Sequence, residues 1–172
     1  RLGANVRMVG RVGADVFSEQ VLTDLKSERV DVSRITKDVN HSTGIALITV
    51  DSKSENTIVV SSGANMSCGQ VELDALQDCI SGASCLILQN EVPLQVNVEA
   101  VKIAQRNNVP VIWDPAPFVR DTNELIKKVD KPVVIDASAF NFINAEYSIN
   151  NFPKKTIFTP HRGELKNLTY NI

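Results

Sequence analysis

Short apolar runs alternate with amphipathic segments along most of the chain, and this alternation restricts the fold more than any other feature of the sequence. The apolar runs have the length of buried strands, and the amphipathic segments repeat their apolar residues at helical spacing. The predicted strands lie at residues 5–9, 84–89, 109–113, 131–136 and 156–159, and the predicted helices at 15–28, 69–80, 93–107, 121–129 and 163–169. Such alternation is typical of a parallel sheet covered by helices on both faces. We therefore predict an α/β fold with a doubly wound, mostly parallel sheet in a three-layer α/β/α arrangement.

One segment interrupts this pattern with an antiparallel element. Residues 44–51 (GIALITVD) and 57–61 (TIVVS) are rich in β-branched side chains, and the polar residues 52–56 separate them. Two such runs around a polar turn predict a β-hairpin over 44–61. Residues 28–32, which lie between the first helix and this hairpin, are predicted to form only a short return segment.

The composition narrows the classes of function. The 172-residue chain is 43% hydrophobic and 22% charged, which is typical of a globular domain with its own core. Its net charge is −2, and Lys and Arg are scattered, so we expect no nucleic-acid partner and no membrane partner. The three cysteines, Cys68, Cys79 and Cys85, lack C-x-x-C spacing. We therefore predict mostly buried, reduced thiols, no metal site and a cytoplasmic location.

The predicted strand ends locate the candidate site. In parallel α/β sheets, ligands bind outside the carboxyl ends of the strands. The segments that follow the predicted strands are 10–15, 89–91, 114–117, 136–141 and 160–164.

Four stretches of the chain resemble the ribokinase family of sugar kinases, in that family's order and spacing over about residues 1–120. They are RLGANVRMVGRVGADVFSEQVLTDL, HSTGIALITVDSKSENTIVVSSGAN, LILQNEVPL and VPVIWDPAP. The resemblance implies a ribokinase-like α/β domain in which the 44–61 hairpin is a lid over the sugar and also a homodimer surface. It also implies phosphoryl transfer from ATP to a primary hydroxyl of a pentose such as ribose, with Mg2+ and a monovalent cation as cofactors.

The last third of the chain resembles a different enzyme on the same fold, the ADP- or ATP-dependent NAD(P)H-hydrate dehydratase. The similar segments are Asp136-Ala-Ser-Ala-Phe-Asn and Thr159-Pro-His-Arg-Gly-Glu, within residues 124–169. In the dehydratase, the first of these segments occupies the position of Asp114-Pro-Ala-Pro in ribokinases. The sequence contains both, so the chain looks like two related enzymes joined, with 124–172 as a dehydratase-like part of one α/β domain.

The two resemblances imply roles for individual residues. Glu91 matches the acid that contacts the sugar in ribokinases, although it could also be a carboxylate at a helix N-terminus. Glu164 and His161 match positions near the nucleotide phosphates and the metal's water shell, and in dehydratases His161 matches a substrate contact. Asp114 and Asp136 are further substrate-binding candidates, each with a turn role as the alternative. No residue is implied as a direct metal ligand.

Three other residues are given mainly structural roles. Asp15 is expected to hold the first strand–helix loop, and Asn65 to serve in a turn after the hairpin. Ser18 stands where the family commonly has glycine, which weakens the expectation of close packing there.

Two segments of the ribokinase site are missing from the sequence. It contains no Gly-x-Gly-Asp, which carries the catalytic base in the family, and no Gly-Gly-Lys-Gly-Ala-Asn, which binds the sugar. The first residues, Arg1-Leu-Gly-Ala, read as the end of a helix with a glycine stop. We therefore expect a ribokinase-like domain that is incomplete at both ends, partial and inactive alone.

Three functions remain open from the sequence. The chain could be part of an ATP-dependent sugar kinase, part of a dehydratase acting on hydrated NAD(P)H, or a non-catalytic α/β module that oligomerises through its hairpin. The 44–61 hairpin favours the kinase, because the dehydratase has no sugar lid.

Overall fold

The chain divides into two compact units in the computed structural model, Arg1–Leu76 and Gln77–Ile172. The structure describes residues 3–114, 116–117, 133–136 and 156–159. Among these described residues, no helix has both the length and the apolar character needed to cross a membrane. The helix α2 (Gln70–Cys79) begins in the first unit and ends in the second, and it confirms the predicted helix at 69–80.

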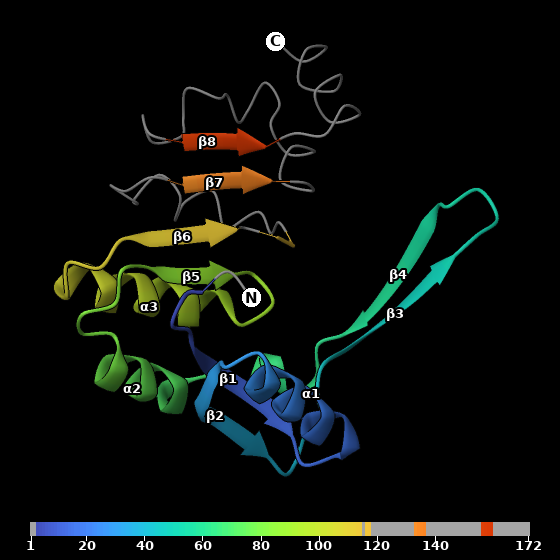
Figure 1. The fold of residues 1–172 in the computed structure, drawn as a ribbon, viewed down its shortest axis with the longest axis horizontal. Coiled ribbons are helices and arrows are strands. Elements are labelled where there is room, and N and C mark those ends of the chain that lie inside the picture. Colours follow the sequence, from blue (N-terminus) through green and yellow to red (C-terminus); the bar gives the residue numbers. More distant parts are fainter. Residues whose placement is uncertain (1–2, 115, 118–132, 137–155, 160–172) are drawn as a thin grey trace. The chain divides into compact units, whose positions relative to one another are not determined.

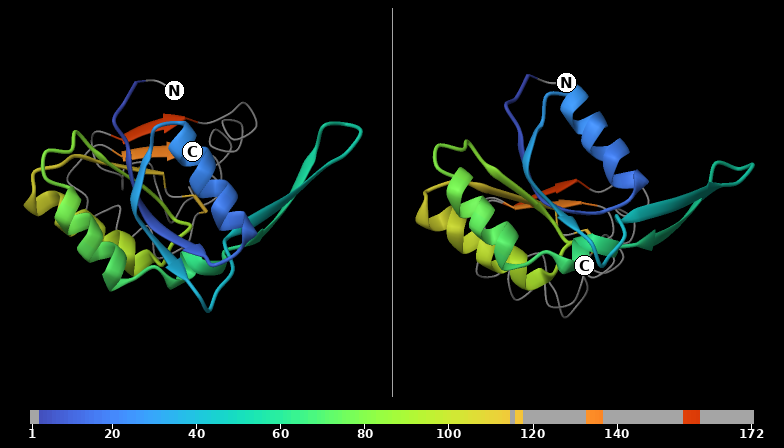
Figure 2. Two further views of the ribbon diagram at one scale, coloured as in Figure 1. Left: turned by 60° about the horizontal axis from the view of Figure 1, so that its bottom comes forward. Right: turned by 90° about the horizontal axis from the view of Figure 1, so that it is seen from below.

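The first unit is built on a parallel strand pair, β1 (Arg7–Gly13) and β2 (Asp31–Asp38). The helix α1 (Val16–Ser27) connects these strands and lies against them (Figure 2). This helix was predicted at 15–28, and the flanking residues are its caps, with Asp15 at the N-cap. Inside α1, Ser18 is fully buried and its hydroxyl donates to the carbonyl of Asp15 at 2.7 Å. Ser18 is thus closely packed, although close packing was in doubt at a position where the family commonly has glycine.

The strand β2 corrects the sequence prediction, which placed only a short return segment at 28–32. Its sequence, DVSRITKD, has two apolar residues, so hydrophobic alternation gives little sign of a strand. Backbone pairing to β1 holds it instead, from Val9 opposite Arg34 to Gly13 opposite Asp38. The strand β1 also extends to Gly13, four residues beyond the predicted end.

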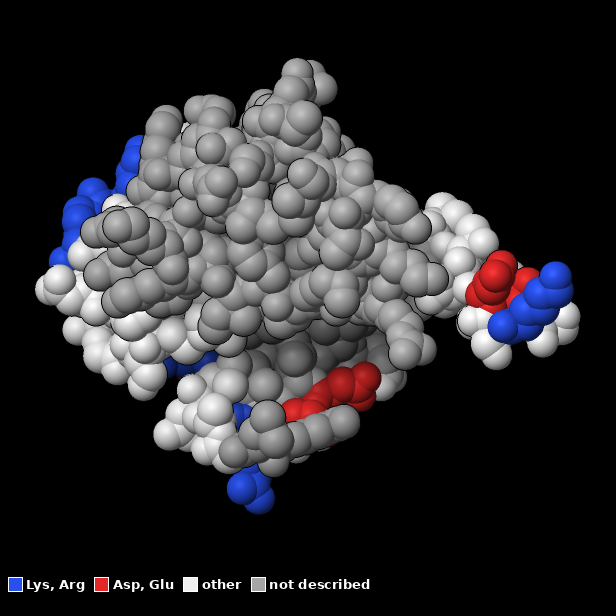
Figure 3. All heavy atoms as spheres, turned by 90° about the horizontal axis from the view of Figure 1, so that it is seen from above, with Lys and Arg blue, Asp and Glu red and all other residues white. Residues whose placement is uncertain are grey.

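The predicted hairpin is confirmed as the antiparallel pair β3 (Ile45–Val50) and β4 (Asn56–Ser61). In the turn, the Asp51 carboxylate accepts hydrogen bonds from the backbone N–H groups of Lys53 and Glu55 at 2.8 and 2.9 Å. Every residue of both strands is exposed, and the hairpin extends away from β1, β2 and α1 (Figures 1 and 2). Figure 3 shows acidic and basic side chains together at its tip. After β4 the chain enters the short 3₁₀ helix η1 (Gly63–Ser67).

The second unit carries the strands β5 (Leu86–Gln89), β6 (Val111–Asp114), β7 (Val133–Asp136) and β8 (Thr156–Thr159). β5 pairs with β6 and β7 with β8, both in parallel. β6 and β7 are neighbours, and the four arrows run in the same direction (Figure 1). These strands confirm the four predicted in this region. The helices predicted at 121–129 and 163–169 lie outside the described residues.

The helix α3 (Leu94–Arg106) packs against β5 and supplies much of the core of the second unit. The helix was predicted at 93–107, with Val96, Val98, Val101 and Ile103 among its buried residues. Val101 and Ile103 are buried, but Val96 and Val98 are only half-buried. The stripe that faces the core contains Asn97, Ala100 and Ala104 instead. The prediction assumed that only apolar residues face the core, and it therefore assigned burial to Val96 and Val98 and not to Asn97.

Candidate active site

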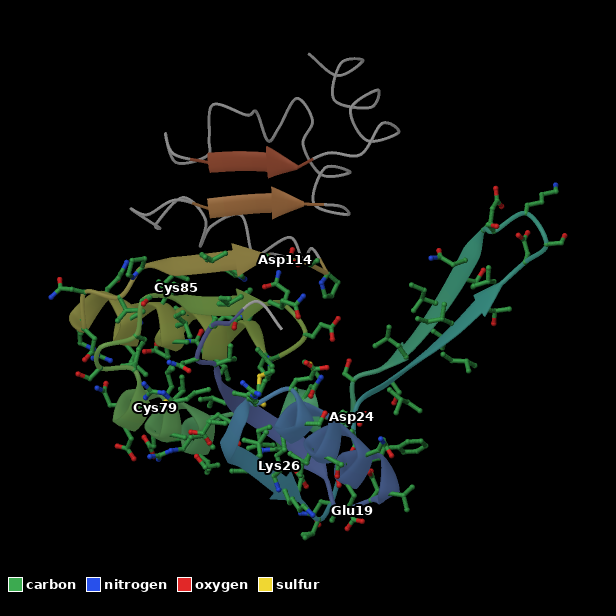
Figure 4. All side chains as sticks on the ribbon, in the orientation of Figure 1. Glu19, Asp24, Lys26, Cys79, Cys85 and Asp114 are labelled. Carbon is green, nitrogen blue, oxygen red and sulfur yellow. The ribbon has the colours of Figure 1, made fainter. Side chains whose placement is uncertain are left out.

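The carboxyl ends of the parallel strands in the second unit carry several candidate residues. Gln89 of β5 is opposite Asp114 of β6, and Asp136 of β7 is opposite Thr159 of β8. Since β6 also lies beside β7, these strand ends form one edge, with Asp114 at the end of β6 (Figure 4). His161 and Glu164 lie outside the described residues.

Asn90 organises the segment that leads from β5 to Glu91. Its side-chain oxygen accepts a hydrogen bond from the indole N–H of Trp113 at 3.0 Å, and its amide nitrogen donates to the Pro117 carbonyl at 3.1 Å. The backbone N–H of Asn90 donates to the Ala116 carbonyl at 3.0 Å. Because Asn90 and Trp113 are both buried, these bonds fix the loop after β6 against the end of β5.

A second asparagine completes this group from α3. The Asn97 amide nitrogen donates to the Gln89 carbonyl at 2.7 Å and lies 3.4 Å from the side-chain oxygen of Asn90. Asn90 lies within the candidate segment 89–91, but neither asparagine was given a role from the sequence. A polar residue in the buried stripe of a helix, three and four residues before Ala100 and Val101, was the available signal for Asn97.

Glu91 follows Asn90 at this edge and is exposed. Its alternative role was that of a carboxylate at the N-terminus of α3. That helix has Pro93 at its N-cap, receives no side-chain hydrogen bond there, and has no acid in its first turn. Glu91 is therefore positioned outside the helix, at a strand end where a carboxylate can accept hydrogen bonds from a ligand.

The two carboxylate oxygens of Asp114 differ in their hydrogen bonding. Its Oδ2 is 3.3 Å from the side-chain nitrogen of Gln89. Its Oδ1 is buried and has no hydrogen-bond partner among the residues that the structure describes. A buried carboxylate oxygen needs a donor or a cation, so this atom can receive a ligand hydroxyl or a water molecule.

The corresponding edge of the first unit is organised by Asp15. Its carboxylate accepts hydrogen bonds from the backbone N–H and the hydroxyl of Thr43, both at 2.7 Å, and from the N–H of Ser18 at 2.9 Å. The bonds from Thr43, and then the bond from Ser18, lower the pKa of the Asp15 carboxyl below its ordinary value. The expectation that Asp15 holds the first strand–helix loop is confirmed, but its main partner, Thr43, was not foreseen.

A buried ion-pair group joins β1, β2 and α2. The Arg11 guanidinium donates from Nε and Nη2 to the two carboxylate oxygens of Glu72, both at 3.1 Å, and from Nη1 to Asp38 at 3.2 Å. The Thr36 hydroxyl also donates to Glu72. Nearby, burial raises the pKa of the Cys68 thiol to about 11, so this cysteine is not a nucleophile at neutral pH.

The described residues contain no group of three or more His, Cys, Asp or Glu side chains placed to hold a metal ion. The acceptors at the strand ends, Glu91 and Asp114, suit hydroxyl groups. The residues implied to lie near the nucleotide, Glu164 and His161, are beyond the described part of the chain.

Two family models match the sequence. Residues 1–133 match the pfkB family of carbohydrate kinases, and residues 116–172 match the NAD(P)H-hydrate dehydratase family. Both resemblances proposed from the sequence are thereby confirmed, and the two matches overlap in the segment that precedes β7.

Individual relatives agree with the first match. The chain is 37% identical over 121 residues to a ribokinase of Schizosaccharomyces pombe, an alignment that covers 70% of this chain and 38% of that protein. The solved structure of a protein called Sa239 superimposes with a TM-score of 0.78 and 28% identity, covering 90% of this chain and 55% of that one. A structure of Arabidopsis thaliana ribokinase complexed with ribose and ATP gives a TM-score of 0.64 and 25% identity, over 80% of this chain and 45% of that one.

The chain therefore spans about two fifths of the length of the curated ribokinase that it matches. The α/β fold predicted from strand–helix alternation is confirmed as ribokinase-like by these structures. The sequence match, the hairpin and the acceptors at the strand ends lead to one assignment: the chain belongs to the pfkB family of carbohydrate kinases.

Proposed function

We propose that this chain supplies the sugar-binding side of an ATP-dependent kinase that phosphorylates the primary hydroxyl of a pentose, with ribose as the expected substrate. The observation that carries the proposal is the hairpin β3–β4, which leaves the unit next to the carboxyl end of β1. A dehydratase site has no need of such a lid. Ribokinase relatives at 37% and 33% identity support the choice of ribose.

In this reaction the sugar hydroxyl attacks the γ-phosphorus of ATP. A new O–P bond forms, the bond from that phosphorus to the β–γ bridging oxygen breaks, the hydroxyl proton leaves, and ADP is released. Mg2+ accompanies the nucleotide and neutralises charge on its phosphates. The sequence has no Gly-x-Gly-Asp, so we assign the removal of the proton to none of its residues.

Binding of the sugar is the part that we assign to described residues. The exposed carboxylate of Glu91 accepts hydrogen bonds from vicinal hydroxyls, and Oδ1 of Asp114 provides a second acceptor at the same strand edge. A charged acceptor strengthens such bonds to about 1.5–3 kcal/mol each. The asparagine group around Trp113 keeps the backbone that carries Glu91 in place.

Saturation-transfer NMR with D-ribose tests this proposal, because it detects weak binding without turnover. We expect signal transfer to ribose from the wild-type chain, and at least a threefold weaker affinity in Glu91→Gln. Glu99→Gln on α3 is the matched control, since that carboxylate pairs with Lys102 at 2.8 Å. No transfer from the wild type, or an equal affinity in both variants, contradicts the proposal.

A second candidate function rests on the match of residues 116–172 to the dehydratase family. In that case Asp136, at the end of β7, and His161 contact hydrated NAD(P)H, and ATP or ADP drives the loss of water. Incubation of the chain with hydrated NADPH and either nucleotide distinguishes the two functions. Recovery of NADPH absorbance that depends on His161 supports the dehydratase and counts against the kinase.

We further propose that a second copy of the chain docks on the hairpin. Neighbouring residues of a strand face opposite sides, and both sides are apolar here: Leu47 and Val59 form one cross-strand pair, and Ile48 and Ile58 the next. All four side chains are at least half exposed, and the outer strand edges can pair with another copy. Sedimentation velocity is expected to give a dimer that Leu47→Asp dissociates, and a wild-type monomer would contradict this partner.

A further inference from the structure

We propose that Asp15 and Thr43 form a clasp that positions the hairpin at the carboxyl end of β1 and thereby sets the affinity for the sugar. The clasp consists of the Asp15 carboxylate, Thr43 and the backbone of Gly13. Its effect on the position of the hairpin stands on geometry alone. Its effect on sugar affinity rests on the proposed kinase function.

The clasp joins the base of the hairpin to the loop between β1 and α1. Thr43 lies two residues before β3 and is 5% exposed. It donates twice to Asp15, from its N–H to Oδ2 and from its hydroxyl to Oδ1, both at 2.7 Å. Its hydroxyl oxygen accepts from the N–H of Gly13, the last residue of β1, at 3.0 Å. The Thr43 hydroxyl therefore acts both as a donor, to Asp15, and as an acceptor, from Gly13, and both bonds hold the hairpin to the end of β1.

Close packing leaves no room for other side chains within the clasp. A Cβ atom on Gly13 would collide with the backbone nitrogen of Thr43, and would lie 2.6 Å from Oδ2 of Asp15 and 2.7 Å from the His41 carbonyl. Asp15 itself is fixed, because its Oδ1 also accepts from the N–H of Ser18 at the start of α1. The hairpin is thus attached to a helix end and a strand end together.

Beside the clasp, the segment that follows β4 is hydrogen-bonded to the segment that precedes β3. The N–H of Ala64 donates to the Ser42 carbonyl at 2.7 Å, and Ala64 is fully buried. A Cβ on Gly44 would lie 2.8 Å from the Ser62 carbonyl. The segments before β3 and after β4 therefore move together, and the link from Thr43 to Asp15 holds both segments to the first unit.

Beyond its base, the hairpin has no buried strand residue to hold it, because all residues of β3 and β4 are exposed. A six-residue strand extends for about 20 Å, so a rotation of about 10° at the base moves the tip by about 3 Å. Under the proposed kinase function, the hairpin is the lid over the sugar. A small rotation at the clasp therefore becomes a large displacement of the part of the hairpin that would cover the sugar.

The chemistry of the clasp requires a carboxylate and a hydroxyl. Asp15 accepts three hydrogen bonds, whereas an asparagine has one acceptor oxygen and would present an NH₂ group to a donor. Thr43→Val keeps the shape of the side chain but removes the hydroxyl, which leaves the N–H of Gly13 without its acceptor. Thr43→Ser keeps every hydrogen bond and is the conservative variant expected to preserve the clasp.

Electron–electron distance measurements between two spin labels test the positional part. The labels are placed by Ser54→Cys in the hairpin turn and Lys26→Cys in the last turn of α1 (Figure 4), after Cys68→Ala, Cys79→Ser and Cys85→Ser remove the native thiols. We expect one narrow distance distribution in the parent chain and at least a twofold broader one with Thr43→Val. Thr43→Ser should stay narrow, and so should Thr49→Val, the matched change within β3. An unchanged width with Thr43→Val overturns the proposal.

Two further measurements keep the outcomes separate. Circular dichroism checks that each variant is folded, and Asp15→Asn, which leaves the bond between Gly13 and Thr43, provides the same measurement if Thr43→Val unfolds. Ribose saturation-transfer NMR then tests the sugar part, with at least a threefold loss of affinity expected for Thr43→Val and recovery for Thr43→Ser. A broad distribution with unchanged ribose affinity overturns the sugar part. If the parent chain gives no signal transfer to ribose, the proposed function is contradicted. The distances between the spin labels still test whether the clasp positions the hairpin.

Discussion

The carboxylate of Asp38 collects donors from three directions at the end of β2. Its Oδ1 accepts from the backbone N–H groups of Asn40 and His41 at 2.8 and 3.1 Å, and its Oδ2 accepts from Arg11 at 3.2 Å. The His41 ring nitrogen Nδ1 lies 3.3 Å from Oδ2. The bond from Asn40, together with those from Arg11 and His41, lowers the pKa of Asp38 from 3.8 to about 2.

This shift makes the stability of the first unit depend on pH. A carboxyl with a lowered pKa in the folded state stabilises that state above its unfolded pKa, and the contribution is lost as pH falls. We therefore expect stability from Asp38 to be complete above about pH 4 and to fall towards about pH 2. Urea unfolding between pH 5 and pH 2, measured at steps of about half a unit, should show this decline.

A carboxylate on α2 is the control for that experiment. Asp38→Asn should reduce the acid decline, and the part that remains includes the contribution of Asp15. Asp74→Asn, at an exposed position that accepts from the Gln70 side chain at 2.7 Å, should leave the decline unchanged. An acid decline of the same size in Asp38→Asn would show that another group is responsible.

Sequence reasoning at the residue scale succeeded where a residue's environment is local. Asp15 was expected to hold its loop, and Glu91 and Asp114 were expected at strand ends, because position after a strand can be read directly from the sequence. Thr43 and Glu72 were missed, since their partners lie 28 and 61 positions away. No local pattern distinguishes these side chains from ordinary surface residues until the strands are paired.

At the scale of elements, α2 is linked to β1 by the ion pair between Glu72 and Arg11. Glu72 is 4% exposed, and its Oε2 also accepts from the N–H of Gly69 at 2.8 Å. We expect Glu72→Ala to lower the free energy of unfolding by about 3 kcal/mol, because it leaves a partly buried guanidinium with one carboxylate partner. Glu99→Ala, which removes the exposed pair with Lys102, should cause a much smaller loss. Urea unfolding of both variants measures the difference, and equal losses would contradict this role for Glu72.

The exit of the hairpin depends on a glycine for two separate reasons. Gly63 has φ +51°, and a Cβ there would collide with the Ser42 carbonyl, whereas Gly82 has φ +73° with nothing within 4 Å. Gly82→Ala should therefore lower the free energy of unfolding by about 1–2 kcal/mol, which is the strain of placing alanine in the left-handed backbone conformation. Gly63→Ala adds a displaced backbone oxygen and should cost about 3 kcal/mol or more. Thermal unfolding checks the order, and a smaller effect at Gly63 would show that the segments before β3 and after β4 are not tightly packed.

Periodicity predicted the elements that carry a strong apolar pattern and failed where that pattern is weak. The helices α1, α2 and α3 and the hairpin were placed within a few residues of their observed bounds. The strand β2 has too few apolar residues for such a prediction, and its pairing with β1 supplies the stabilisation instead. The burial of the asparagines near Trp113 was not predicted for a related reason, because polar side chains are expected outside the core.

At the scale of the whole molecule, the two family matches meet between β6 and β7. The kinase match ends at residue 133 and the dehydratase match begins at residue 116. Asp114 and Asp136, which hold corresponding positions in the two resemblances, end two neighbouring strands. The motifs led to the hypothesis that one strand position is represented twice, and each of the two motifs begins at the end of a separate strand.

We expect the 172-residue polypeptide to show no ATP-dependent phosphorylation of ribose, because its sequence has neither Gly-x-Gly-Asp nor Gly-Gly-Lys-Gly. A general base typically contributes a factor of about 10²–10⁴ in rate, and the missing glycine-rich turn would also stabilise the transferred phosphoryl group. A coupled assay for ADP release, with an intact ribokinase as the positive control, measures this. Turnover above background that depends on ribose would refute the expectation.

The way in which the parallel pairs are connected has a consequence for synthesis on the ribosome. β1 pairs with β2 across α1 alone, and β5 pairs with β6 across α3 alone. Each strand–helix–strand unit can therefore close as soon as its second strand has left the exit tunnel, without waiting for later parts of the chain. The hairpin is still more local and closes within microseconds, far faster than translation at roughly 5–20 residues per second. Pairing of these strands can therefore keep pace with synthesis, so β1 and β5 need not wait long for the strands that they pair with.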